Sequence, residues 1–89
     1  MIKYKMNPNA TYKVFDGEVH ILDYKTANIH SLNSTASFIW KQLIKPTSEK
    51  ALIEKMVKEF DVEEKELKKD LVEFFELYLE NGFILKLND

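Results

Sequence analysis

The spacing of hydrophobic residues along the chain changes near residue 33, and this change divides the sequence into two parts. In the first part, β-branched and aromatic residues gather in the segments 11–15, 18–23 and 28–32, which we predict to be strands. Asp16-Gly17 lies between the first two segments and is typical of a hairpin turn. The short connections favour an antiparallel meander, in which the third strand lies at an edge of the sheet.

After residue 33, apolar residues recur at helical spacing, which predicts three helices. The first covers 35–43, begins after the cap candidates Asn33 and Ser34, and ends before Pro46. The second extends to about residue 60.

The third predicted helix begins near Asp61 and Glu64, whose spacing resembles an acidic capping box, and ends before Gly82. An apolar strand is predicted at 83–87. The segment 1–10 shows only a short alternating pattern, which indicates a weak strand.

Two apolar residues of the third predicted strand lie on opposite faces of it, because side chains alternate along a strand. Ile29 and Ser31 point one way, and Asn28, His30 and Leu32 point the other way. Both Ile29 and Leu32 favour burial. Either a bulge realigns one of them or one faces a groove, and the pattern leaves both alternatives open.

The third predicted helix carries an apolar face that is wider than one core stripe. At about 100° per residue, the residues that cluster within roughly 60° are Leu67, Leu71, Phe74 and Tyr78. The apolar face continues on one side only, to about 140°, through Val72, Phe75 and Leu79. This flank either lines an open groove or is covered by the last strand, and the pattern favours neither alternative.

The composition fits one small α+β domain spanning residues 1–89, with 45% hydrophobic residues and no cysteine. Without cysteine there are no disulfides or thiolate metal ligands, which suits a cytoplasmic location. The N-terminal residues lack the apolar stretch of a signal peptide. The longest apolar runs are far too short to span a membrane, so no membrane partner is expected.

The formal net charge of −2 is distributed unevenly: residues 1–60 carry +3 and residues 61–89 carry −5. Three helices with flanking strands suit a winged helix-turn-helix DNA-binding regulator, which is the alternative function. However, all thirteen basic residues are lysine, and arginine is the usual reader of phosphate and guanine. Residues 63–80 also hold seven acids against three lysines, so DNA would repel this helix and no nucleic-acid partner is expected.

No set of residues predicts catalysis. The only histidines, His20 and His30, would lie opposite each other if the second and third strands pair about a turn near Lys25. Two imidazoles are fewer than the three or four ligands of a metal site. With Gly17 and Gly82 as the only glycines, there is no glycine-rich phosphate loop. We therefore expect a protein without enzyme activity, metal or cofactor.

The predicted edge strand favours a binding function instead. An unpaired edge can accept a further strand from a partner peptide, with backbone hydrogen bonds for affinity and a neighbouring apolar groove for selectivity. The edge at 28–32, beside the apolar flank of the third helix, would supply both parts. The alternative is that the segment 1–10 covers this edge.

Several segments have the order and spacing of a known family. They are 16–23, Thr26, 29–33, Thr35-Ala36 and Ile39-Trp40, followed by 60–62, Asp70-Leu71, Phe74-Phe75, Leu79 and 82–84. In these residues the chain resembles the PqqD-like family, the precursor-peptide recognition elements of ribosomally synthesised, post-translationally modified peptides. The resemblance extends over about residues 11–86, and its most specific part is Leu32-Asn33 with Thr35-Ala36 and Ile39-Trp40.

The resemblance implies a winged-helix-like fold that binds the leader region of a precursor peptide and presents it to modifying enzymes. In such proteins the leader adds as a strand to the third strand and packs against the third helix. The peptide-binding residues implied here are Asn28, Ile29, His30, Ser31 and Leu32 on the strand, and Lys68, Leu71, Val72, Phe75 and Leu79 on the helix.

The resemblance also implies a stand-alone protein whose partners are a leader peptide and a separate protease, cyclase or radical enzyme, as in lasso peptide biosynthesis. An uncovered edge is compatible with a monomer or a weak dimer. Two positions depart from the family pattern. Lys45-Pro46-Thr47 replaces a glycine-containing loop, and Ser34 stands where proline is frequent, but neither lies in the implied groove.

Overall fold

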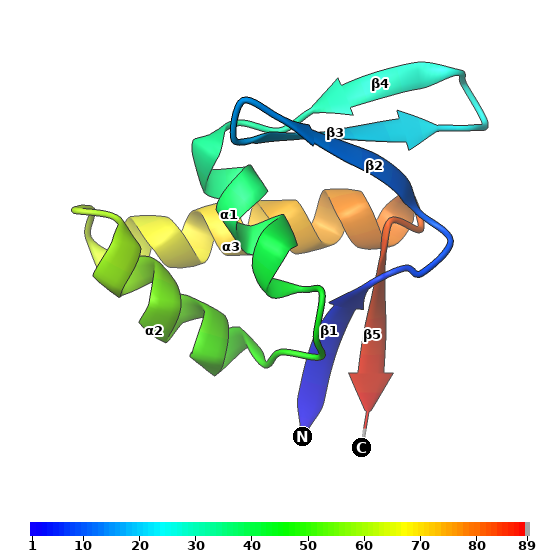
Figure 1. Ribbon diagram of the computed structural model, residues 1–89. Coiled ribbons are helices and arrows are strands. Elements are labelled where there is room, and N and C mark those ends of the chain that lie inside the picture. The colour runs from blue at the N-terminus through cyan, green and yellow to red at the C-terminus, as the bar shows by residue number, and fades with distance from the viewer. Residues whose placement is uncertain (89) are drawn as a thin grey trace.

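The computed structural model describes residues 1–88, which form two small antiparallel sheets and three helices. The elements are β1 (Ile2–Met6), β2 (Thr11–Phe15), β3 (Glu18–Asp23), β4 (Asn28–Ser31), α1 (Ser34–Gln42), α2 (Glu49–Glu59), α3 (Glu64–Glu80) and β5 (Ile84–Asn88). One sheet has the strand order β2-β3-β4, and the other pairs β1 with β5. In Figure 1 the three-stranded sheet lies above α1 and α3, while the β1–β5 pair lies below it, beside the C-terminal part of α3. The predicted α+β class and meander are confirmed.

The hairpin between β2 and β3 has the turn that its sequence predicts. Asp16 and Gly17 both have positive φ angles, 53° and 80°. A two-residue loop of this kind matches the right-handed twist of the strands that it joins. It fixes the register so that Val14 pairs with Val19.

The helix ends agree with the predictions at most positions. The side chain of Asn33 accepts a hydrogen bond from the Ala36 N–H at 2.8 Å and caps α1. At the end of α3, Gly82 takes a φ of +74°, and the Phe83 N–H donates to the Tyr78 carbonyl at 2.9 Å. The predicted capping box at Asp61 is wrong, because α3 begins after Glu63 without a side-chain cap.

A buried hydroxyl joins β4 to α1. The Val19 N–H donates to Ser37 Oγ at 3.0 Å, and this hydroxyl donates to the Leu32 carbonyl at 3.1 Å. The Leu32 N–H donates directly to the Val19 carbonyl at 2.9 Å. Ser37 thus bridges the two strands at the point where the chain leaves the sheet, and Leu32 lies in the core.

The core lies between the inner face of the three-stranded sheet and the three helices. Trp40 of α1 is fully buried and meets the ring of Tyr12 edge-on, with centroids 5.4 Å apart. Around it are further buried apolar residues from β3 and all three helices: Val19, Ile21, Ile39, Leu43, Leu52, Met56, Leu67 and Leu71. These residues hold β3 against α1, which positions β4 at the outer edge.

β1 covers one flank of α3. The ring of Tyr4 stacks on Phe75, with centroids 3.9 Å apart and an angle of 16° between the rings. Tyr4 and Thr47 exchange backbone hydrogen bonds of 2.8 and 2.9 Å, which join β1 to the loop before α2. The segment 1–10 therefore covers this flank, together with β5, and not the edge of β4.

Candidate functional site

One edge of β4 is free of strands among residues 1–88, because β4 pairs only with β3. Antiparallel strands alternate between pairs that exchange hydrogen bonds and pairs that do not. Leu32 bonds Val19, so Leu32 and His30 direct their backbone groups toward β3. The N–H and C=O groups of Ile29 and Ser31 consequently point away from the sheet and are available to a further strand.

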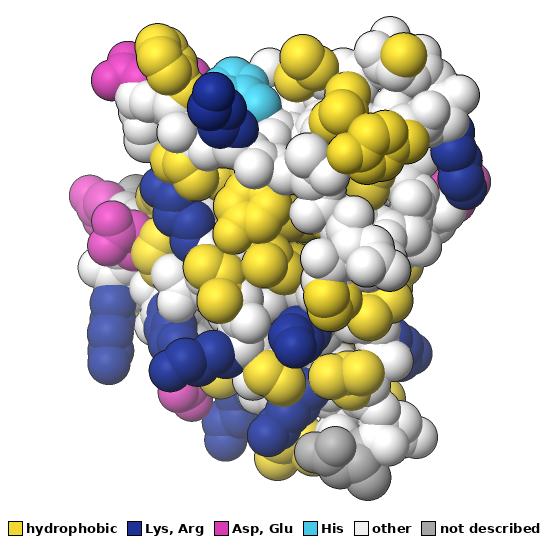
Figure 2. Space-filling view, turned by 45° about the vertical axis from the view of Figure 1, so that its right-hand side comes forward, with side chains coloured by type: hydrophobic (Ala, Val, Ile, Leu, Met, Phe, Trp, Pro, Cys, Tyr) yellow, Lys and Arg dark blue, Asp and Glu magenta, His cyan; other side chains and the backbone are white. Residues whose placement is uncertain are grey.

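The side chain of Ile29 lies on the outer face of the sheet, where it is 66% exposed. There it lines a hollow of about 620 Å³ with Phe15, Leu22 and His20. Figure 2 shows hydrophobic side chains in the upper part of the molecule, the part that holds the three-stranded sheet. Of the two alternatives for the third strand, the structure has the one without a bulge: Leu32 is buried and Ile29 faces a hollow.

The two histidines lie on opposite faces of the sheet. His20 pairs with Ser31, and its Nδ1 is 2.9 Å from the Ser31 hydroxyl. His30 pairs with Ile21 instead. The expectation that His20 and His30 face each other is therefore wrong, because the register is shifted by one residue from the one centred on Lys25.

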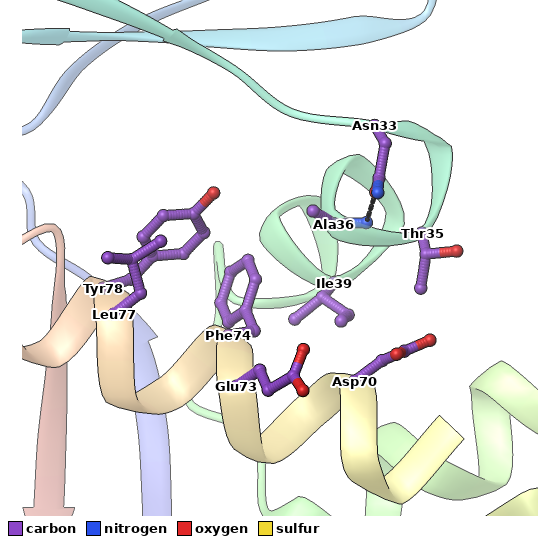
Figure 3. A pocket seen from close by; sticks show the side chains of 9 residues that line it. All are labelled: Asn33, Thr35, Ala36, Ile39, Asp70, Glu73, Phe74, Leu77 and Tyr78. Carbon is purple, nitrogen blue, oxygen red and sulfur yellow. Dashed lines mark hydrogen bonds between the residues drawn. The ribbon is translucent and has the colours of Figure 1, made fainter. Parts of the chain in front are cut away.

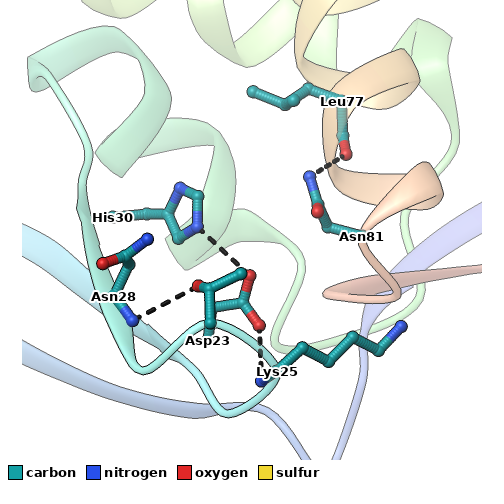
Figure 4. A network of polar contacts seen from close by, with 7 residues as sticks. Asp23, Lys25, Asn28, His30, Leu77 and Asn81 are labelled. Carbon is teal, nitrogen blue, oxygen red and sulfur yellow. Dashed lines mark hydrogen bonds and ion pairs between the residues drawn. The ribbon is translucent and has the colours of Figure 1, made fainter.

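On the inner face, His30 takes part in a small polar network at the turn between β3 and β4 (Figure 4). Its Nε2 lies 3.6 Å from Asp23 Oδ2, and the Lys25 N–H donates to Asp23 Oδ1 at 2.9 Å. The bond from Lys25, aided by His30, holds the pKa of Asp23 below its usual value although burial opposes this shift. The network fixes the turn from which β4 starts.

A groove of about 280 Å³ lies between α1 and α3, next to the end of β4 (Figure 3). The residues that line it are Asn33, Thr35, Ala36, Ile39, Asp70, Glu73, Phe74, Leu77 and Tyr78. Figure 3 shows the side chains of Phe74, Leu77 and Tyr78 pointing from α3 toward β4 and the start of α1. Leu77 is 49% exposed and offers apolar surface to a ligand.

A row of aromatic rings connects this groove to β4. The ring centroids of Phe74 and Tyr78 are 4.3 Å apart, those of Tyr78 and Phe83 5.9 Å, and those of Phe83 and His30 5.3 Å. Burial among these rings raises the pKa of the Tyr78 phenol. The row holds α3 and β4 in a fixed relation and keeps the groove at the end of β4.

None of the residues of α3 that were expected to bind peptide lines this groove. Leu71 is fully buried, and Phe75, which lies under Tyr4, is 7% exposed. Lys68 lies beside α2 and pairs with Glu64 at 3.2 Å. Val72 is 45% exposed, but at about 100° per residue it lies about 140° around the helix from Leu77.

The helix residues that line the groove at the end of β4 come from the core stripe and from its other flank. They are Phe74, Leu77 and Tyr78, with Asp70 and Glu73 at one end. Their positions around the helix predicted Phe74 and Tyr78 to be core residues, and only a small part of each of these two side chains is exposed. On the helical wheel Leu77 lies within about 40° of Glu66, Asp70 and Glu73, so the apolar pattern favoured the opposite flank.

Neither a metal site nor a membrane span is found in the part of the chain that the structure describes. Residues 1–88 contain no cluster of three histidine or acidic side chains that could hold a metal ion. None of the helices among these residues has the length and hydropathy needed to cross a membrane.

A comparison with models of known protein families identifies the family of this chain. The family model of coenzyme PQQ synthesis protein D (PqqD) matches residues 18–84, from the start of β3 to the start of β5. The chain belongs to the PqqD family. The match includes β4, α1 and α3, which are the elements that form the free edge and the groove. No curated protein sequence matches this PqqD-family chain.

Two solved structures share the fold of this PqqD-family protein. TbiB1, in complex with the TbiA(beta) leader peptide, has a TM-score of 0.81 at 20% identity, and the match covers 96% of this chain and 99% of that one. Lasso peptide synthetase B1, complexed with the leader peptide, has a TM-score of 0.77 at 23% identity, with 92% and 96% covered. The likeness extends over nearly the whole of each chain and confirms the fold, including the β1–β5 pair outside the family match.

Proposed function

We propose that this protein is a non-catalytic recognition element that binds the leader region of a ribosomally synthesised precursor peptide. The leader adds as a strand to β4, and a separate modifying enzyme, such as a protease, cyclase or radical enzyme, acts on the bound precursor. The observation that carries this proposal is the free edge of β4 beside the groove between α1 and α3. Both similar structures are complexes with leader peptides, which supports the same role for this chain.

The edge suits a peptide ligand because its backbone groups are fixed before binding. Ile29 and Ser31 present two N–H and two C=O groups in the plane of the sheet, and an added strand satisfies all four. The bound residue that lies beside His30 then points to the inner face, toward Leu77 and Tyr78, because side chains alternate. Backbone pairing would provide affinity, and this inward residue would provide selectivity.

The strand part of the site is tested by removing one outward N–H. Proline is tolerated where a strand N–H faces away from the sheet, so Ile29→Pro should fold and still lose one edge hydrogen bond. We expect its affinity for a synthetic leader, taken from the precursor encoded nearest to this gene, to fall by roughly tenfold. Ile29→Val is the matched control, since it keeps the N–H. Equal affinity of the proline variant and the control would contradict strand addition.

The helix part is tested by two matched substitutions on α3. Leu77 and Val72 are similarly exposed, at 49% and 45%, but only Leu77 lies in the groove. Leu77→Asp should weaken leader binding by roughly 10- to 100-fold because it removes apolar contact area. Val72→Asp should bind like the wild type. Titration followed by backbone NMR should also shift the signals of residues 28–33 and 70–78, and shifts confined to β1 and β5 would place the site elsewhere.

A further inference from the structure

The groove between α1 and α3 differs in character between its two ends. Near the C-terminal end of α3, its wall consists of Leu77 and Tyr78. At the other end, Figure 3 shows the carboxylates of Asp70 and Glu73 pointing up from α3 toward the start of α1. A bound strand that follows β4 therefore passes first over apolar surface and then over negative charge, or the reverse.

The two carboxylates have no cation of their own. Within residues 1–88, Lys68 pairs with Glu64 and His30 lies beside Asp23, but neither Asp70 nor Glu73 pairs with a lysine. Lys69 precedes Glu73 by four residues, but no ion pair joins them. Thr35 and Asn33, which lie across the groove, are uncharged, and the Asn33 side chain is committed to capping α1. The negative charge at this end is thus available to a ligand.

The dimensions of a strand and a helix place ligand residues over these positions. Side chains on one face of a strand are about 6.6 Å apart, at about 3.3 Å per residue. One helical turn, the separation of Leu77 and Glu73, is about 6 Å at about 1.5 Å per residue, and Asp70 lies about 4.5 Å further. A ligand side chain over Leu77 is therefore followed, two or four residues along the strand, by one over Glu73 or Asp70.

We propose that the peptide recognised here combines an apolar residue with a lysine or arginine two or four residues away on the same face of the strand. This inference rests on the proposed function and specifies the chemistry of its ligand. The apolar side chain packs on Leu77 and Tyr78. The cation lies between Asp70 and Glu73, where two carboxylates attract it and a leader with an acid at this position is repelled.

The test is selection of short random peptides on the immobilised protein, followed by affinity measurement with the selected peptides. Peptides that lose binding to Ile29→Pro are kept, because they use the edge of β4. We expect the kept peptides to be enriched in the apolar-plus-basic pattern. Replacement of their basic residue by alanine should weaken binding by roughly fivefold at low salt, and the difference should shrink between about 0.05 and 0.5 M salt.

Charge reversal provides the decisive comparison. The double variant Asp70→Lys/Glu73→Lys should select an acidic residue at the same position. Its control, Glu54→Lys/Glu59→Lys, changes the net charge equally but on α2, away from the groove, and should keep the basic preference. Edge-binding peptides without any charge preference would overturn this inference and leave the proposed function intact. If no selected peptide depends on Ile29, the proposed function itself fails.

Discussion

Ser37, a polar residue on the buried face of the short helix α1, has a structural role. The residue is 2% exposed, and its hydroxyl accepts a hydrogen bond from the Val19 N–H and donates one to the Leu32 carbonyl. Ser37→Ala would leave these two buried groups without partners and should lower the free energy of unfolding by about 1–3 kcal/mol. Urea unfolding, followed by the fluorescence of Trp40, measures this loss. Ser34→Ala, at an exposed position of the same helix, should change stability by less than about 0.5 kcal/mol.

Asp23 makes stability depend on pH in the acid range. Its pKa is lower in the folded protein than in the unfolded chain because the carboxylate accepts the Lys25 N–H and lies beside His30. A lowered pKa gives stability that is fully present above the unfolded pKa, about 3.9, and is lost as the pH falls through the folded value. Asp23→Asn should therefore be less stable than the wild type at neutral pH. The difference should shrink below about pH 4 in urea titrations, and a constant difference would contradict this account.

At the scale of residues, the sequence predicted which positions are apolar but not which neighbour covers them. The pattern identified Leu32 and Ile29 as competing for burial, and the choice between them depends on Ser37, whose hydroxyl fixes Leu32 in the core. The helical spacing likewise placed Phe75 correctly on an apolar flank of α3. It could not show that Tyr4, from a distant part of the chain, stacks on this residue.

At the scale of elements, the pairing of β1 with β5 determines which side of α3 remains open. β1 is anchored by Thr47 and covers Phe75, so one flank of the helix is closed and the other, with Leu77, is left beside β4. Tyr4→Ala should remove the stacked ring and lower the free energy of unfolding by about 1–3 kcal/mol. Thermal unfolding should shift down by roughly 4–20 °C, and Lys5→Ala, the adjacent control, should shift it little.

The same pairing explains which elements could be predicted. The hairpin of β2 and β3, the helix cap at Asn33 and the end of α3 are specified by nearby residues, and each was predicted from them. β1 is specified by β5, whose partner residues lie almost the whole chain length away, as in the pair Lys3 and Leu87. The short alternating pattern of β1 does not indicate which strand it pairs with. The sequence therefore could not show which flank of α3 is covered and which is open.

At the scale of the molecule, stability and recognition are assigned to different parts. The core is closed by the three helices and the β1–β5 pair, whereas the free edge of β4 and the exposed Leu77 of the groove lie outside it. A domain of this size can therefore keep an unpaired edge without unfolding. The acidic second half of the chain, which disfavours DNA, also disfavours self-pairing through α3, because two copies would bring like charges together.

This separation predicts that binding of the proposed leader peptide stabilises the whole domain, although the peptide contacts only the edge of β4 and the groove at its end. At a free peptide concentration about 100 times Kd, binding to the folded state adds about 2.7 kcal/mol to its stability, which corresponds to a rise in Tm of roughly 10–20 °C for a domain of this size. Amide exchange should slow at Ile29 and Ser31, because their N–H groups would donate hydrogen bonds to the added strand. It should slow far less at Asn28 and His30, because their backbone groups already bond β3. Protection of all four amides to the same extent would indicate global stabilisation without edge pairing. The Ile29→Pro variant, measured with the same peptide, should show a smaller rise in Tm, because the peptide then adds less binding energy to the same fold.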